Sequence, residues 1–464
     1  MSQTSERVAI IGLDCVPPEL VFERWADELP TFTRLRSEGM FGKLRSITPP
    51  ITVPAWMCMM TGKSPGALGI YGFRNRIDHS YDGFRVVTSS SFREPALWDL
   101  LGQVGKSSIV VGVPPSYPPK PLRGCMVSCL LTPDTSVVYT QPPELKNEIE
   151  GAVGSYLFDV EDFRTDDRNG LLKRLYQLTE QRFALMTHLV SSKSWDFLAF
   201  VEMGPDRLHH GFWDCFDSGH RNYEPGNCWE ASGLEYYRFL DQKLADFLGL
   251  FDDQTHIFIV SDHGAKRMDG GICVNEWLRE EGYLTLLEPP ATAVRFSPEM
   301  VKWSETMAWG EGGYYGRVFL NVRGREPHGV VEPGDYELLR TELKEKLEGL
   351  GDEEGNPIGT KVYRPEELYP EVHGIAPDLI VLFGDLYWRS VGSVGSGDVW
   401  THTNDTGPDA ANHAEDGIFL YAGPAVKCHG EERFGLRLLD IAPTVLRLFG
   451  LPVPSEMEGV PIWV

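Results

Sequence analysis

The chain has 464 residues and a formal net charge of −24 at pH 7, and 42% of its residues are hydrophobic. This composition provides for a sizeable core and excludes general disorder, and the acidic charge argues against a nucleic acid polymer as a partner. No apolar run approaches about 18 residues, so the sequence predicts no transmembrane helix and no membrane partner.

The cysteines and the N-terminus indicate the compartment. The chain contains eight cysteines without paired zinc-type spacing: Cys15, Cys58, Cys125, Cys129, Cys215, Cys228, Cys273 and Cys428. Several lie in apolar segments, which is typical of reduced thiols. The polar residues Met1 to Arg7 lead directly into an apolar run and do not resemble a signal peptide. We therefore expect a cytoplasmic protein, and the oligomeric state stays open.

Through its first half the chain alternates apolar runs with helical patterns. Non-alternating runs predict buried parallel strands at 8–14, 107–113, 197–201 and 257–260. Apolar residues at helical spacing, together with helix stop signals, predict helices at 30–40, 95–104, 170–190 and 233–250. This order predicts an α/β fold: a doubly wound, mainly parallel sheet with helices on both faces.

The pattern changes from about residue 290 to residue 390. A charged helix, a turn rich in Gly, Glu and Asp, and short alternating strands predict a smaller α/β lobe at 291–390, inserted as a cap. Residues 1–290 and 391–464 would form the core, which the chain re-enters with a strand at 417–422 and a last helix at 439–448.

A threonine framed by prolines stands out in the first half. Pro49, Pro50 and Pro54 fix the backbone on both sides of Thr52, and residues 55–61 predict a buried helix that stops near Gly62. Thr52 would then lie just before a helix N-terminus, where free N–H groups and the helix dipole favour an anion. The alternative is that Thr52 only caps this helix.

Polar residues of one kind follow several predicted strands. They are Asp14, then Asp206 with His209 and His210, then Asp262 with His263, and finally His413, which directly precedes a strand. Ligands bind at the carboxyl ends of strands in open α/β sheets. Carboxylates and imidazoles that converge there would repel one another or go unsatisfied without a cation, so together they predict a divalent metal site.

In these motifs the chain resembles the alkaline phosphatase superfamily, in particular its type I phosphodiesterase/nucleotide pyrophosphatase branch and bacterial phosphohydrolase or phosphomutase relatives. The resemblance covers nearly the whole chain. Its markers are Gly12-Leu13-Asp14, Thr52-Val53-Pro54-Ala55-Trp56 with Thr61-Gly62, Asp206-Arg207-Leu208-His209-His210, Ser261-Asp262-His263-Gly264, Asn404 to Asp409 with Asn412-His413, and Asp440-Ile441-Ala442-Pro443-Thr444-Val445 with Gly450-Leu451-Pro452.

The resemblance implies a two-metal centre. One metal would be held by Asp206, His210 and His413, and the other by Asp14, Asp262, His263 and the oxygen of Thr52. Thr52 would be the nucleophile and would carry a phospho-threonine intermediate. The nitrogen and oxygen ligands suit Zn²⁺, and Mn²⁺ would tolerate them. His209 would then support a ligand or line the pocket.

The chain departs from the family pattern directly after the threonine. Nucleotide pyrophosphatases usually have Asn-His after Thr-x-Pro, where this chain has Ala55-Trp56, so a contact to a phosphoryl oxygen is missing. Trp56 would be core or would wall the pocket. Candidates to replace the contact are Lys63, Arg74, Arg76 and His402, each equally plausible as a solvated charge.

We therefore expect a metal-dependent phosphoryl-transfer hydrolase, a phosphodiesterase or phosphomonoesterase, acting on a small phosphorylated molecule. A phosphomutase on the same site and a non-catalytic phospho-ligand-binding relative remain the alternatives. A sulfatase would need a Cys/Ser-x-Pro-x-Arg motif, and Cys58 is followed by Met59-Met60-Thr61-Gly62, so we reject this class.

Overall fold

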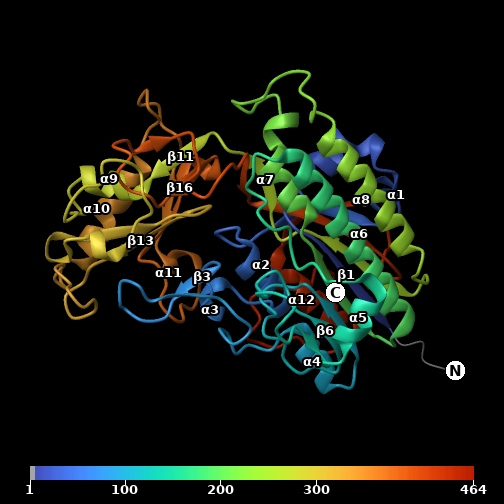
Figure 1. The fold of residues 1–464 in the computed structure, drawn as a ribbon. Helices are drawn as coiled ribbons and strands as arrows, with labels where there is room; N and C mark the ends of the chain where they lie inside the picture. Colours follow the sequence, from blue (N-terminus) through green and yellow to red (C-terminus); the bar gives the residue numbers. More distant parts are fainter. Residues whose placement is uncertain (1–5, 464) are drawn as a thin grey trace.

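The structure is a computed structural model that describes residues 6–463. Its centre is a nine-stranded sheet (Figure 1). The strands lie in the order β20 (Glu431–Arg437), β2 (Met40–Arg45), β19 (Asp416–Ala422), β9 (Thr255–Val260), β1 (Arg7–Leu13), β8 (Phe197–Glu202), β5 (Ser108–Val111), β6 (Gly124–Val127) and β7 (Thr140–Gln141). The sheet is mainly parallel, and its antiparallel neighbours are β19 with both β9 and β2, and β6 with β7.

Helices cover both faces of this sheet (Figure 1). Gly12 of β1 faces Trp56 of α2 (Thr52–Thr61), because a Cβ on Gly12 would lie 2.4 Å from that ring. The preceding residue of β1 is paired with Phe200, whose ring contacts Phe183 of α6 (Arg168–Ser192) and Phe247 of α8 (Ser232–Leu248). Successive side chains of a strand point to opposite faces, so α2 and the α6–α8 pair lie on opposite sides.

The remaining helices of this larger body extend the two layers. They are α1 (Pro30–Glu38), α3 (Pro65–Leu68), α4 (Leu97–Gln103), α5 (Leu145–Val153), α7 (Gly204–Phe216) and α12 (Ile441–Leu448). The predicted doubly wound α/β fold is therefore confirmed. The apolar runs form its central strands because residues of β1 and β8 are buried on both faces of the sheet. Within residues 6–463, no helix is long and apolar enough to cross a membrane.

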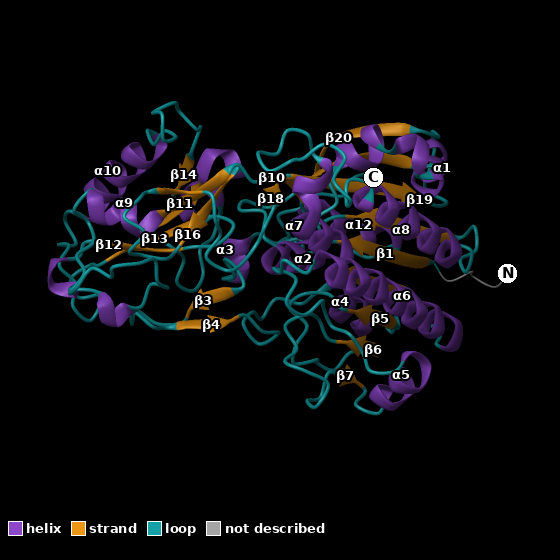
Figure 2. Ribbon diagram, turned by 45° about the horizontal axis from the view of Figure 1, so that its top comes forward, coloured by secondary structure: helices purple, strands orange, loops and turns teal. Residues whose placement is uncertain are grey.

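A smaller lobe stands beside the large sheet (Figure 2). One of its sheets has the order β12 (Ala308–Glu311), β13 (Gly316–Leu320), β15 (Leu379–Leu382), β14 (Lys361–Tyr363), and the other has β16 (Trp388–Val391), β11 (Gly270–Cys273), β17 (Trp400–Thr401). Its helices are α9 (Val274–Glu280), α10 (Tyr336–Glu348) and α11 (Pro365–Leu368). The predicted lobe 291–390 lies inside the stretch from Ile272 to Val399. Buried apolar residues of this stretch, together with Phe84, form a hydrophobic core separate from that of the large sheet.

Two short ladders lie between the larger body and the lobe. The hairpin of β3 (Arg74–Arg76) and β4 (Phe84–Val86) places Phe84 in the core of the lobe. Strand β10 (Gly264–Arg267) follows β9 by a few residues and pairs with β18 (Ala411–Ala414), with Ala265 opposite His413. This second ladder brings the end of the chain back to the carboxyl end of β9.

Candidate metal centre

The first cluster of ligand atoms is formed by α7 and β18. Asp206 and His210 lie on the same face of α7, four residues apart, and His210 Nε2 is 3.3 Å from Asp206 Oδ1. His413 of β18 places its Nε2 3.8 Å from the same carboxylate oxygen. One ligand atom from each of the three residues lies within 4.8 Å of the others, and all three residues are buried. The structure therefore brings together the first predicted ligand set.

The second cluster lies at the carboxyl ends of β1 and β9, which are neighbours in the sheet. His263 Nε2 is 3.2 Å from Asp262 Oδ2 and 3.8 Å from Asp14 Oδ1, and the three residues also meet the 4.8 Å limit. The rings of His263 and His413 stack with their centroids 3.8 Å apart, so the two clusters are adjacent. The sheet edge thus gathers both predicted ligand sets in one buried site.

Thr52 faces this site and does not cap its helix. Helix α2 begins at Thr52 itself, and its N-terminus has no side-chain cap hydrogen bond. The Thr52 hydroxyl instead lies 3.2 Å from Nε2 of His263. The helix ends as predicted at Gly62, whose φ of 67° is the left-handed conformation that glycine adopts without strain. The capping alternative for Thr52 is therefore wrong in this structure.

Each of the three histidines is oriented by a partner on its Nδ1 atom. His210 Nδ1 lies 2.7 Å from Asp409 Oδ1, His413 Nδ1 lies 2.7 Å from the carbonyl of Pro50, and His263 Nδ1 lies 3.0 Å from the carbonyl of Gly264. A carbonyl oxygen can only accept, so Nδ1 of His263 and His413 carries the proton. Nε2 is then free to bind a metal, which is the arrangement that metal-ligating histidines usually show.

Several buried side-chain atoms of the site have no hydrogen-bond partner among the described residues, and they indicate the kind of ligand that the site can bind. Among the described residues, no hydrogen-bond partner is found for Oδ1 of Asp14 and Asp206, Oδ2 of Asp262, or Nε2 of His210 and His413. Buried polar atoms are normally satisfied, because leaving one unpaired costs about 1–3 kcal/mol. These orphan atoms are the same ones that face each other in the two clusters. The donor set therefore fits divalent metal ions.

The electrostatics of the carboxylates agree with this fit. Burial, followed by the charge of Asp206, raises the pKa of Asp14 well above its usual value. Burial and the charge of Asp14 do the same to the pKa of Asp262. Burial also raises the pKa of Asp206, but the charges of His210 and Arg207 outweigh it and hold that pKa well below normal. A bound cation would stabilise the ionised form of all three carboxylates.

Trp56 belongs to the core and also supports a ligand. The side chain is fully buried in the main hydrophobic cluster, and its Nε1–H donates to Asp14 Oδ2 at 2.7 Å. This bond uses one oxygen of Asp14 and leaves the other facing His263. Gly12 is needed for the close approach of the indole, since a Cβ there would collide with the ring. Trp56 therefore orients a predicted metal ligand.

The other predicted substrate residues are distributed around the centre. His209 is buried behind it, with Nε2 3.0 Å from the hydroxyl of Tyr237, and burial lowers the pKa of His209 to about 3. Among the described residues, Lys63 forms its ion pair with Glu94 rather than with a site residue.

Three further candidates for the contact to a phosphoryl oxygen lie on the side of the centre that faces the lobe. His402 lies 3.0 Å from a carboxylate oxygen of Glu353 and lines a cavity of about 450 Å³ that His210 also lines. Arg76 is buried in an ion pair with Glu326. Arg74 is exposed and lines a different cavity, in the lobe.

Tyr314, Asp409 and Arg389 were not among the predicted site residues. The ring of Tyr314 stacks on His413 at 3.9 Å and on His210 at 5.1 Å. Asp409 accepts from His210 through one oxygen and from Arg389 through the other, each at 2.7 Å. Asp409 lies four residues before His413, so its place in the Asp-x-x-x-His motif was the available signal. The sequence around Tyr314 and Arg389 contains no signal for a site role, because both residues belong to the lobe and reach the site only in the folded structure.

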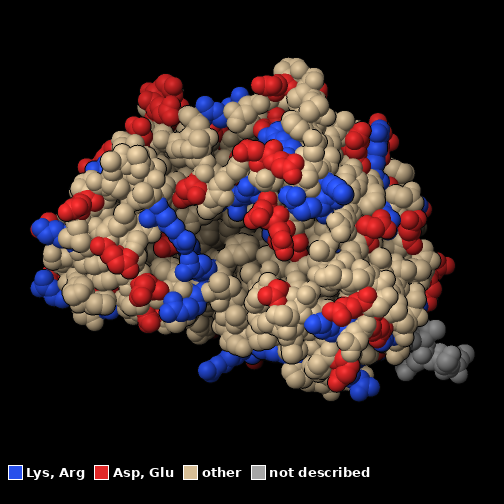
Figure 3. Space-filling view, viewed as in Figure 1, with Lys and Arg blue, Asp and Glu red and all other residues tan. Residues whose placement is uncertain are grey.

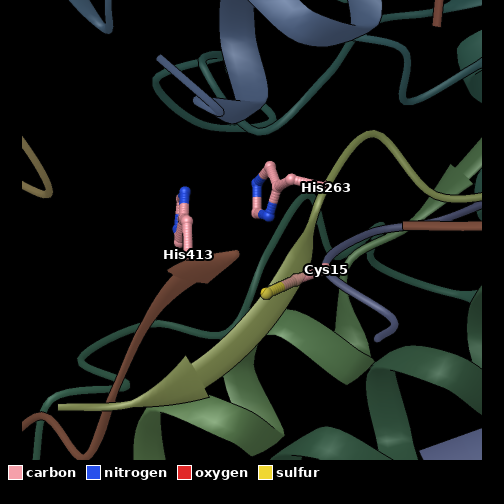
Figure 4. A group of neighbouring side chains, drawn as sticks. All are labelled: Cys15, His263 and His413. Atoms are coloured by element: carbon pink, nitrogen blue, oxygen red, sulfur yellow. The ribbon is translucent and has the colours of Figure 1, made fainter. Parts of the chain in front are cut away.

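Cys15 is a further group close to the centre (Figure 4). Its Sγ lies within 4.8 Å of ligand atoms of His263 and His413, which stand side by side in that view. The backbone of Cys15 has a φ of 65°, which is uncommon for a residue with a side chain, and its N–H donates to Asp262 at 3.3 Å. Burial, followed by the charge of Asp206, raises the pKa of its thiol well above the usual value. Its position directly after Asp14 was the only signal for it.

The comparison with protein families decides which family this is. The model of the type I phosphodiesterase / nucleotide pyrophosphatase family matches residues 8–409. The chain belongs to this family. The match includes every predicted metal-site residue except His413, and it makes the chain a phosphoric ester hydrolase. The family acts on small phosphorylated substrates such as nucleotides and usually uses divalent metals.

A comparison with solved structures shows which known fold this type I phosphodiesterase family member shares. Human ectonucleotide pyrophosphatase / phosphodiesterase 5 is similar with a TM-score of 0.56 and 13% sequence identity, over 98% of this chain and 97% of that chain. An identity this low shows a shared fold. A search of curated proteins gives no significant match.

Proposed function

We propose that this hydrolase transfers a phosphoryl group to Thr52 at a centre of two divalent metal ions and then releases it to water. The observation that carries the proposal is the position of the Thr52 hydroxyl, 3.2 Å from His263 Nε2 and beside the orphan ligand atoms. A buried hydroxyl at this place is surrounded by the groups that phosphoryl transfer requires.

The chain would hold the metals with its two clusters. Asp206, His210 and His413 would bind one ion, while Asp14, Asp262, His263 and Thr52 would bind the other. When bound, the ions would activate the nucleophile and neutralise charge on the phosphoryl oxygens. The nitrogen and oxygen donors favour Zn²⁺, and Mn²⁺ suits the same set.

The residues of the chain position the nucleophile before any reaction. Burial lowers the pKa of His263 to about 4, so the ring is neutral near pH 7. Its Nδ1–H donates to the carbonyl of Gly264, which leaves Nε2 unprotonated beside the Thr52 hydroxyl, as two ligands of one ion require. The start of α2 directs the first N–H groups of the helix toward the same space, where they favour phosphoryl oxygens. These groups would hold the hydroxyl oxygen beside the place that the phosphoryl group would occupy.

The threonine is the sharpest test of this proposal. We expect Thr52→Ala to lower kcat by about 10⁴-fold or more, because the nucleophile is removed, while Thr52→Ser keeps a hydroxyl and a measurable rate. Hydrolysis of bis(p-nitrophenyl) phosphate and p-nitrophenyl phosphate with Zn²⁺ or Mn²⁺ would measure the rates and separate diesterase from monoesterase. Metal content and melting temperature serve as controls for the fold. Near-normal turnover by Thr52→Ala would rule out Thr52 as the nucleophile.

We also propose that the protein works in the cytoplasm and that residues 291–390 form a functional cap. All eight cysteines lie within the described residues and are free thiols, which favours a reducing compartment. The separate hydrophobic core of the lobe supports the division into two bodies. Tyr314 supports the cap role, because it comes from the lobe and its ring covers two of the histidines.

A further inference from the structure

A cavity of about 540 Å³ opens on the lobe next to the metal centre. Its wall carries four arginines from separate elements: Arg74 of β3, Arg295 of a loop, Arg317 of β13 and Arg389 of β16. We call this cavity the arginine pocket. In the space-filling view, the hollow between the two bodies has basic side chains along its rim (Figure 3). Its volume is within the usual range for small-molecule sites.

The pocket is positively charged in a strongly acidic chain. Its four arginines face two carboxylates, Glu311 and Asp405, while the whole chain has a formal net charge of −24. Arg74 and Arg295 are exposed, and neither forms an ion pair with any described residue. Arg317 is 3.8 Å from Glu311, too far for a close hydrogen-bonded pair. Arg317 also donates to the Arg74 carbonyl, and the buried Arg389 donates to Asp409 and Thr406, so Arg74 and Arg295 are the two arginines whose charge stays available to a ligand.

Glycines shape the floor of this pocket. The loop at Gly312 and Gly313 crosses the strand end at Gly392 so closely that a Cβ on Gly312 would lie 2.4 Å from the Gly392 nitrogen. Ser390 and Gly313 exchange backbone hydrogen bonds of 2.8 and 3.1 Å, which fix the crossing. The floor thus consists of backbone without side chains and leaves room beneath the arginines.

Two connections tie the arginine pocket to the metal centre. Arg389 of the pocket and His210 of the centre bind the two oxygens of one carboxylate, that of Asp409. Gly313 of the floor is followed directly by Tyr314, whose ring stacks on His413. The guanidinium of Arg389 lies 4.8 Å from the centroid of that ring. A substrate with its phosphoryl group at the metals would therefore have the pocket as a neighbour on the lobe.

From this geometry we propose that the arginine pocket binds a second oxyanion of the substrate, a phosphate or a carboxylate that is not cleaved. The assignment rests on the proposed function, because it needs the scissile phosphoryl group at the metal centre. Arginine forks match phosphate and carboxylate geometry and bind both through charge-assisted hydrogen bonds. The preferred substrates are therefore phosphate esters that carry a second negative group, and neutral esters are poorer substrates.

The test uses three aryl phosphate esters that differ only in the group opposite the phosphate. The group is a carboxylate, a phosphonate or a neutral carboxamide, and each ester is supplied both as a monoester and as a methyl diester. The metal-loaded enzyme is assayed for kcat/KM on each at low and high salt. The carboxylate and phosphonate arms show which oxyanion is preferred. The preference should shrink at high salt, since exposed charges are screened.

The decisive variant is R74Q/R295Q, since both side chains are exposed and the fold does not depend on an ion pair of either. We expect its preference for charged over neutral esters to fall about tenfold from the wild-type value. The matched control R34Q/R238Q removes two exposed arginines paired with Glu38 and Glu28 on the helical face and should keep the preference.

The outcomes separate the two proposals. An unchanged preference in R74Q/R295Q, or an equal loss in the control, would overturn the assignment of the pocket while leaving the hydrolase intact. If the metal-loaded wild type hydrolyses none of the esters, the proposed function fails, and the assignment falls with it. Comparing preferences between proteins removes the intrinsic difference in reactivity between the esters.

Discussion

The metal centre and the arginine pocket are neighbours that are built in different ways. The centre gathers buried carboxylates and imidazoles at the ends of β1, β8 and β9 of the large sheet, and His413 joins them from β18. The pocket gathers arginines, two of them exposed, from a hairpin, a loop and two sheets of the lobe. The difference indicates a division of labour. Under the two proposals, the sheet edge would hold the chemistry, and the lobe surface would distinguish one substrate from another.

Metal removal is expected to give the largest effect, and it should act on the centre alone. Chelation should abolish turnover, and Zn²⁺ or Mn²⁺ should restore it, because the orphan atoms of both clusters lose their cations. At metal concentrations 100-fold above Kd, each bound ion should add about 2.7 kcal/mol to the free energy of unfolding. Metal analysis and thermal melts would check this. A purified and reconstituted protein without any divalent ion would contradict the central hypothesis.

Asp409 contacts both the metal centre and the arginine pocket, and its substitution should give the next largest effect. Asp409→Asn weakens the acceptor for His210 Nδ1 and the partner of Arg389, so we expect a loss of 10- to about 100-fold in metal affinity. Titration of the metal-free protein would measure it. Asp405→Asn is the matched control, because Asp405 lines the arginine pocket and, within residues 6–463, accepts a hydrogen bond only from the Gly392 N–H. Equal losses in both variants would show that the two regions are not separable.

A substitution of Trp56 tests whether its hydrogen bond to Asp14 supports metal binding at the centre. Trp56→Phe removes the donor to Asp14 Oδ2, and hydrogen bonds to charged groups contribute about 1.5–3 kcal/mol, so metal affinity should fall at least about tenfold. Trp213→Phe removes an equivalent bond of 2.8 Å to Asp217 and serves as the control. The result to look for is a change in metal Kd for the first variant alone. An unaltered Kd would mean that Trp56 only fills the core.

Lys63 is expected to give the smallest effect. Lys63 forms an ion pair with Glu94. Lys63→Gln should therefore change kcat/KM by less than about threefold and the free energy of unfolding by less than about 1 kcal/mol. Steady-state rates with both p-nitrophenyl esters would test this. A loss comparable to that of R74Q/R295Q would place Lys63 among the substrate contacts and extend the recognition surface beyond the arginine pocket.

The centre could be predicted from the sequence because its signals are local. Non-alternating apolar runs define the buried strands, and a polar residue directly after such a run must lie at the edge of the sheet. Asp14 and Asp262 follow their strands immediately, and Asp206 and His210 have a helical spacing. Parallel neighbours then bring these residues together without further information. The same reasoning gave the helix after Thr52 and its end at Gly62, although the helix begins at Thr52 itself and not after it.

Other features were decided only by the tertiary structure. The stretch around Thr52 by itself fitted a helix cap, and the aspartates and histidines elsewhere in the chain favoured a nucleophile. In the structure the Thr52 hydroxyl does not cap the helix and lies 3.2 Å from His263, 211 residues away. Trp56 was left between core and pocket wall, and its bond to Asp14 depends on the missing Cβ of Gly12. The arginines of the pocket are separated by up to hundreds of residues, and exposed charges carry no periodicity. Burial leaves a pattern in a sequence, whereas a surface assembled from loops exists only once the chain has folded.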